Sequence, residues 1–203
     1  MKKIIIAIDS FKGCLTSAEA GKAAEKGIKS INPSCHTSVI PIADGGEGLL
    51  DVLITATKGK YITLSAHGPL MKMAKTHYGL SGNGRTAIIE MAAISGLPLV
   101  PIEQRNPMLT TTFGTGELIK DALNKGCRNF IIGIGGSATN DAGLGMLQAL
   151  GFRFLDKSGH TLGTGGQIME AVANIDTSGI HPALRETHFM VACDVANPFY
   201  GPD

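Results

Sequence analysis

The feature that most constrains the fold is an alternation of apolar runs and helical patterns over the first sixty residues. The run "IIIAID", residues 4–9, is β-branched and nearly continuous, which is typical of a central strand covered on both faces. A capping-box pair, Thr16 and Glu19, begins a helical pattern that Pro33 ends. A second strand and a second helix follow at 37–44 and 46–59. This order predicts a largely parallel sheet that binds ligands at the carboxyl ends of its strands.

The pattern changes from Lys60 onward. Three strand-like segments follow, and "GNG" between the last two is a hairpin signal. They lie at 61–70, 73–81 and 85–93. The alternation then resumes, with helices expected at 117–126 and 140–151 and strands at 129–135, 152–156 and 187–195. We therefore predict an α/β fold of two α/β lobes with mainly parallel sheets. The first lobe is expected to be flavodoxin-like or Rossmann-like, and the second to contain a mixed sheet.

Composition excludes several classes of partner. Lys and Arg number 18 against 17 Asp and Glu, so the chain has no broad attraction for nucleic acid or an anionic membrane. The apolar run near the N-terminus is too short for a signal peptide or a membrane span. The four cysteines are scattered without metal-ligand spacing, which fits reduced thiols in the cytoplasm. The expected partners are small molecules, with no nucleic acid and no membrane.

The segment "DGGEG", residues 44–48, places two carboxylates in a glycine-rich turn. Gly45 and Gly46 would let the backbone approach a ligand closely, whereas Asp44 and Glu47 would repel a bare phosphate. In one interpretation, the carboxylates accept hydrogen bonds from hydroxyl groups or hold hydrated Mg²⁺, while the glycine amides receive a carboxylate or phosphate. The alternative is an acidic cap at the start of a helix, with no ligand.

Two other strand ends carry candidate polar side chains. The turn "IDSFKG" offers Ser10 and Lys12, and Lys12 could neutralise an anionic substrate group. A solvated turn lysine is the alternative. The segment "ACDVANP" ends an apolar run at Asp194, where an unpaired buried carboxylate would be costly. Asp194 therefore has a partner or a function, unless it only initiates the turn before Asn197 and Pro198.

The segment "GIGGSATNDAGLGMLQALG", residues 133–151, first suggests a dinucleotide site. The relaxed GxGxxG/A fingerprint is satisfied by Gly133, Gly135 and Ala138. Asp156 follows at the spacing of a ribose-binding acid, so an NAD-dependent dehydrogenase is one hypothesis. Against it, Asn140 and Asp141 fall where a pyrophosphate would meet the helix, and the carboxylate would repel it unless a metal intervenes. A glycine-rich turn without a ligand is a third interpretation.

Several familiar enzyme motifs are absent from the sequence, including GxxxxGK[ST], the protein-kinase signature set, GxSxG and HExxH. Instead, the chain resembles the bacterial glycerate kinase family, the type that acts on D-glycerate. The resemblance rests on "IAIDSFKGCLTSAEA", "PIADGGEG", "IIEMAAISGL", "TTFGTGELIKDAL", "IIGIGGSATNDAGLGMLQALG" and "ACDVANPFYGP". These blocks span almost the whole chain, and they favour a kinase over a dehydrogenase.

The resemblance implies ATP-dependent phosphorylation of D-glycerate with Mg²⁺. Asp194 would be the catalytic base or a metal-linked acid, with Lys12 as a second catalytic residue and Asp44 as a further Mg²⁺ ligand. The residues expected to bind substrate or phosphate are Ser10, Asp44, Gly45, Gly46, Glu47, Gly135, Gly136, Ser137, Asn140 and Asp141.

The resemblance covers roughly the first half of the family's chains. It implies that residues 1–70 are the first segment of a discontinuous α/β domain and that 71–203 are a second, inserted α/β domain, which the end at Asp203 would leave incomplete. A catalytically incomplete fragment that only binds ligand is therefore an alternative function. Missing strands would expose edges and apolar surface, which favour self-association into a homo-oligomer.

Overall fold

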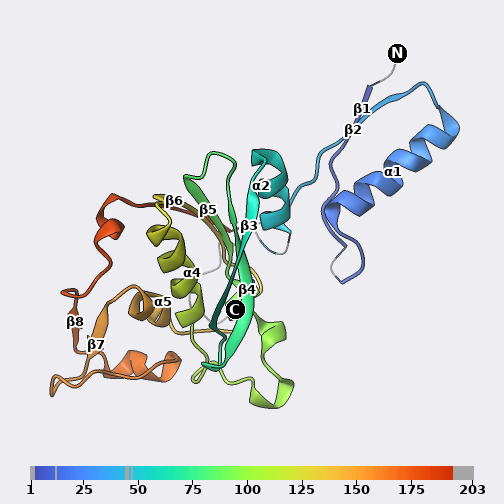
Figure 1. The fold of residues 1–203 in the computed structure, drawn as a ribbon. Helices are drawn as coiled ribbons and strands as arrows, with labels where there is room; N and C mark the ends of the chain where they lie inside the picture. The colour runs from blue at the N-terminus through green and yellow to red at the C-terminus, as the bar shows by residue number, and fades with distance from the viewer. Residues whose placement is uncertain (1–2, 12, 44–45, 47, 194–203) are drawn as a thin grey trace.

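The computed structural model describes residues 3–11, 13–43, 46 and 48–193 (Figure 1). A small β-α-β unit comes first, consisting of β1 (Lys3–Ile6), α1 (Ser17–Ile31) and β2 (His36–Val39). The two strands are parallel, as predicted for the first lobe. Thr16 and Glu19 form the predicted capping box at the start of α1. Figure 1 shows this unit beside a larger part that contains the rest of the described chain.

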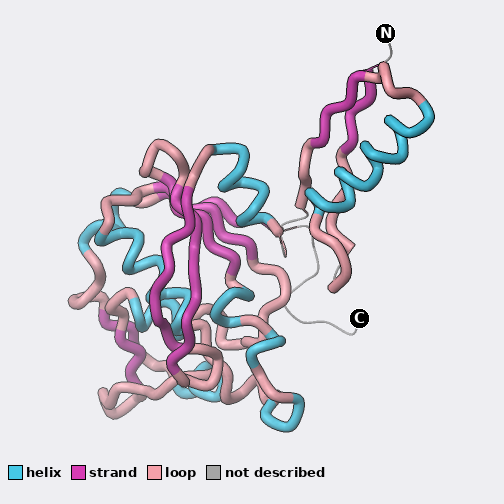
Figure 2. Tube along the Cα trace, turned by 45° about the vertical axis from the view of Figure 1, so that its right-hand side comes forward, coloured by secondary structure: helices cyan, strands magenta, loops and turns pink. Residues whose placement is uncertain are grey.

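The larger part is built on a five-stranded mixed sheet, visible in Figure 2. Its strands, in spatial order, are β3 (Lys60–His67), β4 (Met73–Leu80), β5 (Thr86–Glu90), β6 (Asn129–Gly133) and β9 (His188–Ala192). The first three are antiparallel neighbours, whereas β5, β6 and β9 are parallel. The sheet confirms the predicted α/β class and the mixed sheet of the second lobe.

Helices cover both faces of this sheet. The helix α4 (Phe113–Asn124) packs on one face, over Ala87 and Ile89 of β5, and α5 (Leu144–Ala149) packs against α4. The helix α2 (Leu49–Thr57) packs on the other face, against Ile88. Successive residues of a strand point to opposite faces, which is why β5 serves both cores. The remaining elements are α3 (Ala92–Ser95), η1 (Leu97–Leu99), η2 (Ile102–Gln104), β7 (Arg153–Leu155), η3 (Gly166–Ala171), β8 (Asn174–Asp176) and η4 (Pro182–Glu186).

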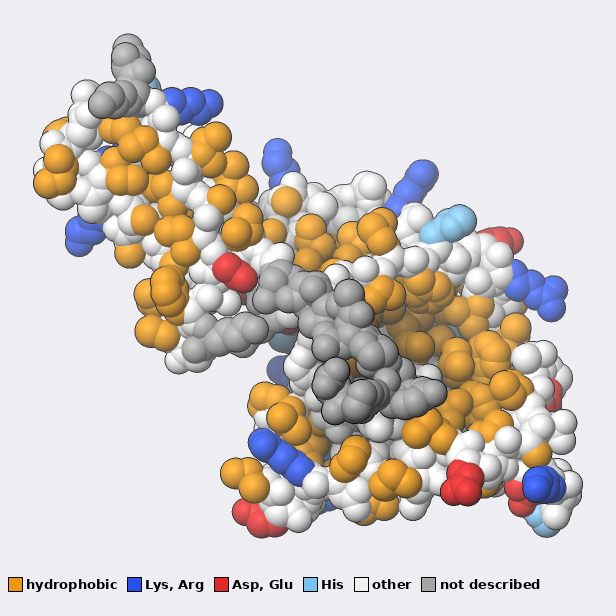
Figure 3. Space-filling model, turned by 180° about the vertical axis from the view of Figure 1, so that it is seen from behind, with side chains coloured by type: hydrophobic (Ala, Val, Ile, Leu, Met, Phe, Trp, Pro, Cys, Tyr) orange, Lys and Arg blue, Asp and Glu red, His pale blue; other side chains and the backbone are white. Residues whose placement is uncertain are grey.

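The expectation that the first strand is covered on both faces is wrong for the described residues. Ile6 is buried, but Ile5 is 61% exposed. Among the described strands, β1 pairs with β2 alone, and α1 contacts this pair. Strand β9, at the edge of the large sheet, is also uncovered, with Met190 65% and Val191 57% exposed. Apolar side chains accordingly gather on the surface of both parts (Figure 3).

The helix expected from residue 140 begins only at Leu144. Ala142 and Gly143 have φ angles of 49° and 77°, in the left-handed region, so the backbone cannot be helical there. The predicted division near residue 70 remains a prediction. In the structure, β3 pairs with β4 along its whole length, and α2 packs against β4 and β5. Both elements therefore pack with the part of the chain that follows them.

Candidate active site

Three of the sequence motifs lie where parallel strands of the large sheet end. Glu90, Gly133 and Ala192 end three parallel neighbouring strands, and they are paired in register. Glu90 of "IIEMAA", Gly133 at the start of the glycine-rich turn and Ala192 therefore come together at the carboxyl edge of these strands. Such an edge is the usual ligand site of an α/β sheet. Asp194, two residues beyond Ala192, lies outside the described residues.

The start of α2 meets the same edge. The backbone N–H of Leu50 donates to Glu90 Oε1 at 2.8 Å, which joins the first turn of α2 to the end of β5. A carboxylate in this position is favoured by the partial positive charge of a helix N-terminus. Glu90 is not among the site residues predicted from the sequence. The available signal was the same as for Asp194, namely an acidic residue that ends an apolar strand.

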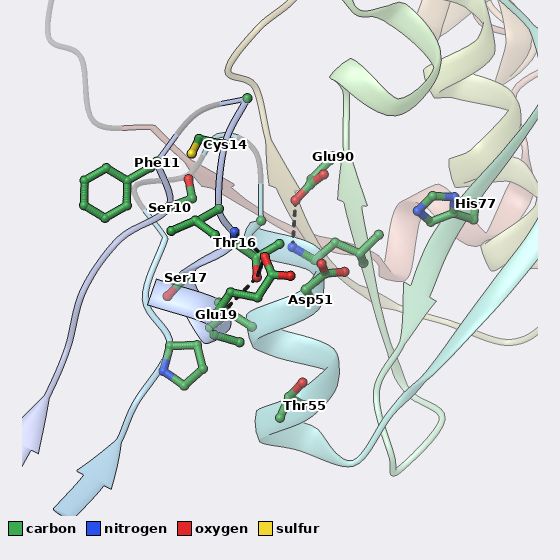
Figure 4. A pocket seen from close by; sticks show the side chains of 17 residues that line it. Ser10, Phe11, Cys14, Thr16, Ser17, Glu19, Asp51, Thr55, His77 and Glu90 are labelled. Atoms are coloured by element: carbon green, nitrogen blue, oxygen red, sulfur yellow. Dashed lines mark hydrogen bonds between the residues drawn. The ribbon is translucent and has the colours of Figure 1, made fainter. Parts of the chain in front are cut away.

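A cavity of about 440 Å³ opens between this edge and the small unit (Figure 4). Its walls come from the loop before α1, the start of α1, the first turns of α2, and strands β4 and β5. The polar and ionisable side chains that line it are Ser10, Cys14, Thr16, Ser17, Glu19, Asp51, Thr55, His77 and Glu90. Ser10, predicted to bind substrate, is thus placed at the cavity.

Ser17 holds two strand ends together at this cavity. Its hydroxyl donates to the carbonyl of Ile8 at 2.6 Å and accepts from the N–H of Ile42 at 3.0 Å. Ile8 follows β1 and Ile42 follows β2, so the loops that lead into "DSFKG" and "DGGEG" are held side by side. Lys12, Asp44, Gly45 and Glu47 lie outside the described residues, whereas Gly46 is described and half-buried.

The described lining is acidic. Glu19, Asp51 and Glu90 contribute carboxylates, and no lysine or arginine belongs to the described lining. All three carboxylates have protein partners, since Glu90 accepts the N–H of Leu50. Hydrogen bonds from the backbone and hydroxyl of Thr16 lower the pKa of Glu19. The hydroxyl of Tyr61 donates to Asp51 at 2.5 Å, which raises the pKa of Tyr61 to about 12.

The donor chemistry of this cavity fits Mg²⁺ better than a bare anion, because Mg²⁺ prefers carboxylate oxygens and water. Within the described part of the chain, however, no three His, Cys, Asp or Glu side chains are grouped closely enough to hold a metal ion. The predicted ligands Asp44 and Asp194 both lie outside that part. The described carboxylates could therefore supply only part of a coordination shell.

The glycine-rich turn after β6 is partly exposed. Gly135 and Gly136 are exposed, and Gly136 has φ of 72°, which glycine adopts without strain. Ser137 is half-buried and pairs with Gly96 as an isolated bridge. Asn140 is exposed. These four predicted anion-binding residues are thus available to solvent in one continuous segment.

Asp141 has different surroundings, because it is only 1% exposed. Its Oδ2 accepts from the N–H groups of Thr112 and Gly145 at 2.8 and 3.1 Å, and its Oδ1 accepts from the N–H of Gly143 at 3.1 Å. The hydroxyls of Thr111 and Thr112 also donate to it. The carboxylate therefore joins the turn before α4 to the turn before α5, and protein donors occupy both of its oxygens.

The fold is that of an α/β protein with a cavity beside the carboxyl edge of its parallel strands. A model of the glycerate kinase family matches residues 4–203, and the chain belongs to that family. It is 54% identical over 200 residues to a glycerate kinase of Bacillus subtilis (strain 168) and 49% identical over 199 residues to a glycerate 2-kinase of Escherichia coli (strain K12). Each match covers 98% of this chain and 52% of the relative.

A solved structure agrees. A crystal structure of a candidate glycerate kinase 2 from Salmonella typhimurium LT2 superimposes with a TM-score of 0.88 at 48% identity. The match covers 98% of this chain and 54% of that one. The chain thus spans about half the length of the relatives and the solved structure that it matches.

The dehydrogenase hypothesis finds no support in these comparisons. The structure also contradicts its geometry, because a dinucleotide fold needs the strand after the fingerprint helix in the same parallel sheet. Strand β7 instead pairs with β8 in a separate antiparallel sheet. Asp156 accepts the N–H groups of Ser158 and His160 in its own turn.

In the described residues, no helix is long and apolar enough to cross a membrane.

Proposed function

We propose that the protein to which this chain corresponds is a glycerate kinase that transfers a phosphoryl group from ATP to a hydroxyl of D-glycerate. The observation that carries this proposal is the meeting of Glu90, the start of α2 and the glycine-rich turn at one edge beside an acidic cavity. The substrate is inferred from the names of the relatives.

The four cysteines form no disulfide in the described structure, which supports a cytoplasmic location.

Phosphoryl transfer requires positioned groups and neutralised charge more than covalent chemistry by the protein. We assign the cavity beside Ser10 and Glu90 to glycerate, because hydroxyl groups donate well to carboxylates. Asp194 would accept the proton of the attacking hydroxyl, and Lys12 would face the anionic substrate. When bound, ATP would provide the transferred group, and Mg²⁺ would neutralise the charge on its phosphates.

An ADP-release assay with D-glycerate, ATP and Mg²⁺ tests the proposal on this chain and on a longer chain that spans the whole family length. We expect glycerate-dependent turnover by the longer chain. Absence of turnover there would refute the proposed function. Turnover by the 203-residue chain would exclude the alternative that it only binds ligand, whereas glycerate binding without turnover would support that alternative.

Glu90→Gln in the longer chain tests the site itself. The glutamine keeps an oxygen that can accept from the N–H of Leu50, so the start of α2 should stay in place while the charge is lost. We expect kcat/KM to fall at least about tenfold, which corresponds to about 1.4 kcal/mol. The control is Glu186→Gln, since the side chain of Glu186 is 77% exposed and does not line the cavity. Equal activity of both variants would contradict the assignment.

A further inference from the structure

A second cavity, of about 250 Å³, lies where the glycine-rich turn passes the loop after η1. On one side it is lined by Ser137 and Thr139 of the turn, and on the other by Arg105 and Asn106. Val100, only 2% exposed, and Leu97 add apolar walls. The acidic cavity described above has no cation in its described lining, whereas this one has a guanidinium group.

Arg105 is held at this cavity by one of its nitrogens. Its Nε donates to the carbonyl of Val100 at 3.2 Å, which fixes the guanidinium plane beside the wall. Among the described residues, no carboxylate lies within ion-pair distance of Arg105. Its terminal nitrogens therefore keep a planar pair of donors that suits phosphate oxygens.

The turn offers further donors to the same cavity. The N–H of Ala138 donates to Ser95 and its carbonyl accepts from the hydroxyl of Thr110, both at 2.8 Å, so this residue is tied to the protein. The N–H groups of Ser137 and Thr139, on either side, donate to no acceptor in the described part of the chain. The hydroxyl of Ser137 donates to the carbonyl of Thr139 at 3.4 Å. Two amides and the hydroxyl of Thr139 thus remain for an oxygen-rich ligand.

We infer that this cavity binds the phosphate chain of a nucleoside triphosphate, with Arg105 as its cationic anchor. The inference rests on the proposed function, since it assigns the donor nucleotide to this cavity and leaves the cavity beside Ser10 and Glu90 to glycerate. The turn begins at Gly133, which is paired with Glu90. Glu90 lines the first cavity, and Ser137 and Thr139, a few residues beyond Gly133, line the second.

Titration calorimetry on the 203-residue chain, with ATP or with inorganic tripolyphosphate and without glycerate, tests this inference. We expect Arg105→Ala to weaken the binding of ATP and of tripolyphosphate at least tenfold. Arg105→Lys should weaken it less, because lysine keeps the charge but lacks the planar pair of donors. The control is Arg185→Ala, since Arg185 is exposed and lines neither cavity. Unchanged affinity of Arg105→Ala, or an equal loss in Arg185→Ala, would overturn the inference.

The same variants separate the inference from the proposed function. If Arg105→Ala loses ATP and tripolyphosphate binding but the longer chain does not phosphorylate glycerate, the phosphate site stands and the proposed function fails. If the longer chain carrying Arg105→Ala phosphorylates glycerate with an unchanged KM for ATP, the proposed function stands and the phosphate site fails. Binding of ATP but not of tripolyphosphate to the unaltered chain would also overturn the inference, because it would place recognition on the nucleoside.

Discussion

Replacing Asp141 by asparagine should destabilise the fold strongly, although the two side chains have nearly the same shape. Both carboxylate oxygens accept backbone N–H groups, Oδ2 from Thr112 and Gly145 and Oδ1 from Gly143. An asparagine has only one oxygen. Whichever way its amide is turned, its NH₂ group therefore faces at least one backbone N–H, and two donors oppose each other.

The less damaging orientation places the NH₂ group toward Gly143 and keeps the oxygen toward Thr112 and Gly145. One donor then loses its acceptor, which costs about 1–3 kcal/mol. The remaining bonds also change from charge-assisted to neutral, at a further cost of about 1 kcal/mol. Part of this is offset because a buried charge has been removed. The net loss should therefore be below the sum of the two costs, and we expect the free energy of unfolding to fall by about 1–3 kcal/mol.

Urea unfolding of the 203-residue chain, followed by circular dichroism, measures this change. Asp156→Asn is the matched control. The N–H groups of Ser158 and His160 both donate to Oδ1 of Asp156, so an asparagine oxygen can keep both. We expect a loss below about 1 kcal/mol there. Equal losses in the two variants would refute the reasoning, because they would show that the distribution of donors over the two oxygens does not matter.

Three further predictions concern packing, pH and association. Gly116→Ala should lower the unfolding midpoint in urea, because a Cβ there would lie 2.3 Å from the carbonyl oxygen of Met146, whereas Gly27→Ala, with open space at its Cβ, should not. The N–H of Ser178 and the guanidinium of Arg153 lower the pKa of Asp176 to about 2. The ionised carboxylate therefore stabilises the fold above the unfolded pKa near 3.8, and this contribution is lost as the pH falls through 2. Asp176→Asn should make stability depend less on pH in the acid range of an unfolding titration, and an unchanged dependence would contradict this. The exposed apolar surface of β1 and β9 should make the 203-residue chain self-associate, and Ile5→Lys with Met190→Lys should shift sedimentation toward the monomer; a monomeric unaltered chain would show the prediction to be wrong.

The amino-acid sequence alone determined the order of the elements. The β-branched runs, the capping box at Thr16 and the hairpin signal "GNG" act over a few residues, so local propensity specifies them without the rest of the chain. The motif blocks likewise identified the family, because they depend on residue order and not on distance. Ser10 and the exposed turn at Gly135 and Gly136 could be proposed from such local signals.

Only the tertiary structure decided which of these groups meet. Glu90 reaches the first turn of α2 across forty residues, and no local pattern encodes that distance. Asp141 and Asn140 are neighbours in the sequence, yet one is buried among five protein donors and the other is exposed. The left-handed backbone at Ala142 and Gly143 and the packing of α5 on α4 produce that difference. Burial and long-range contact are properties of the packed chain, and they separated a carboxylate that joins two turns from groups that remain open to a ligand.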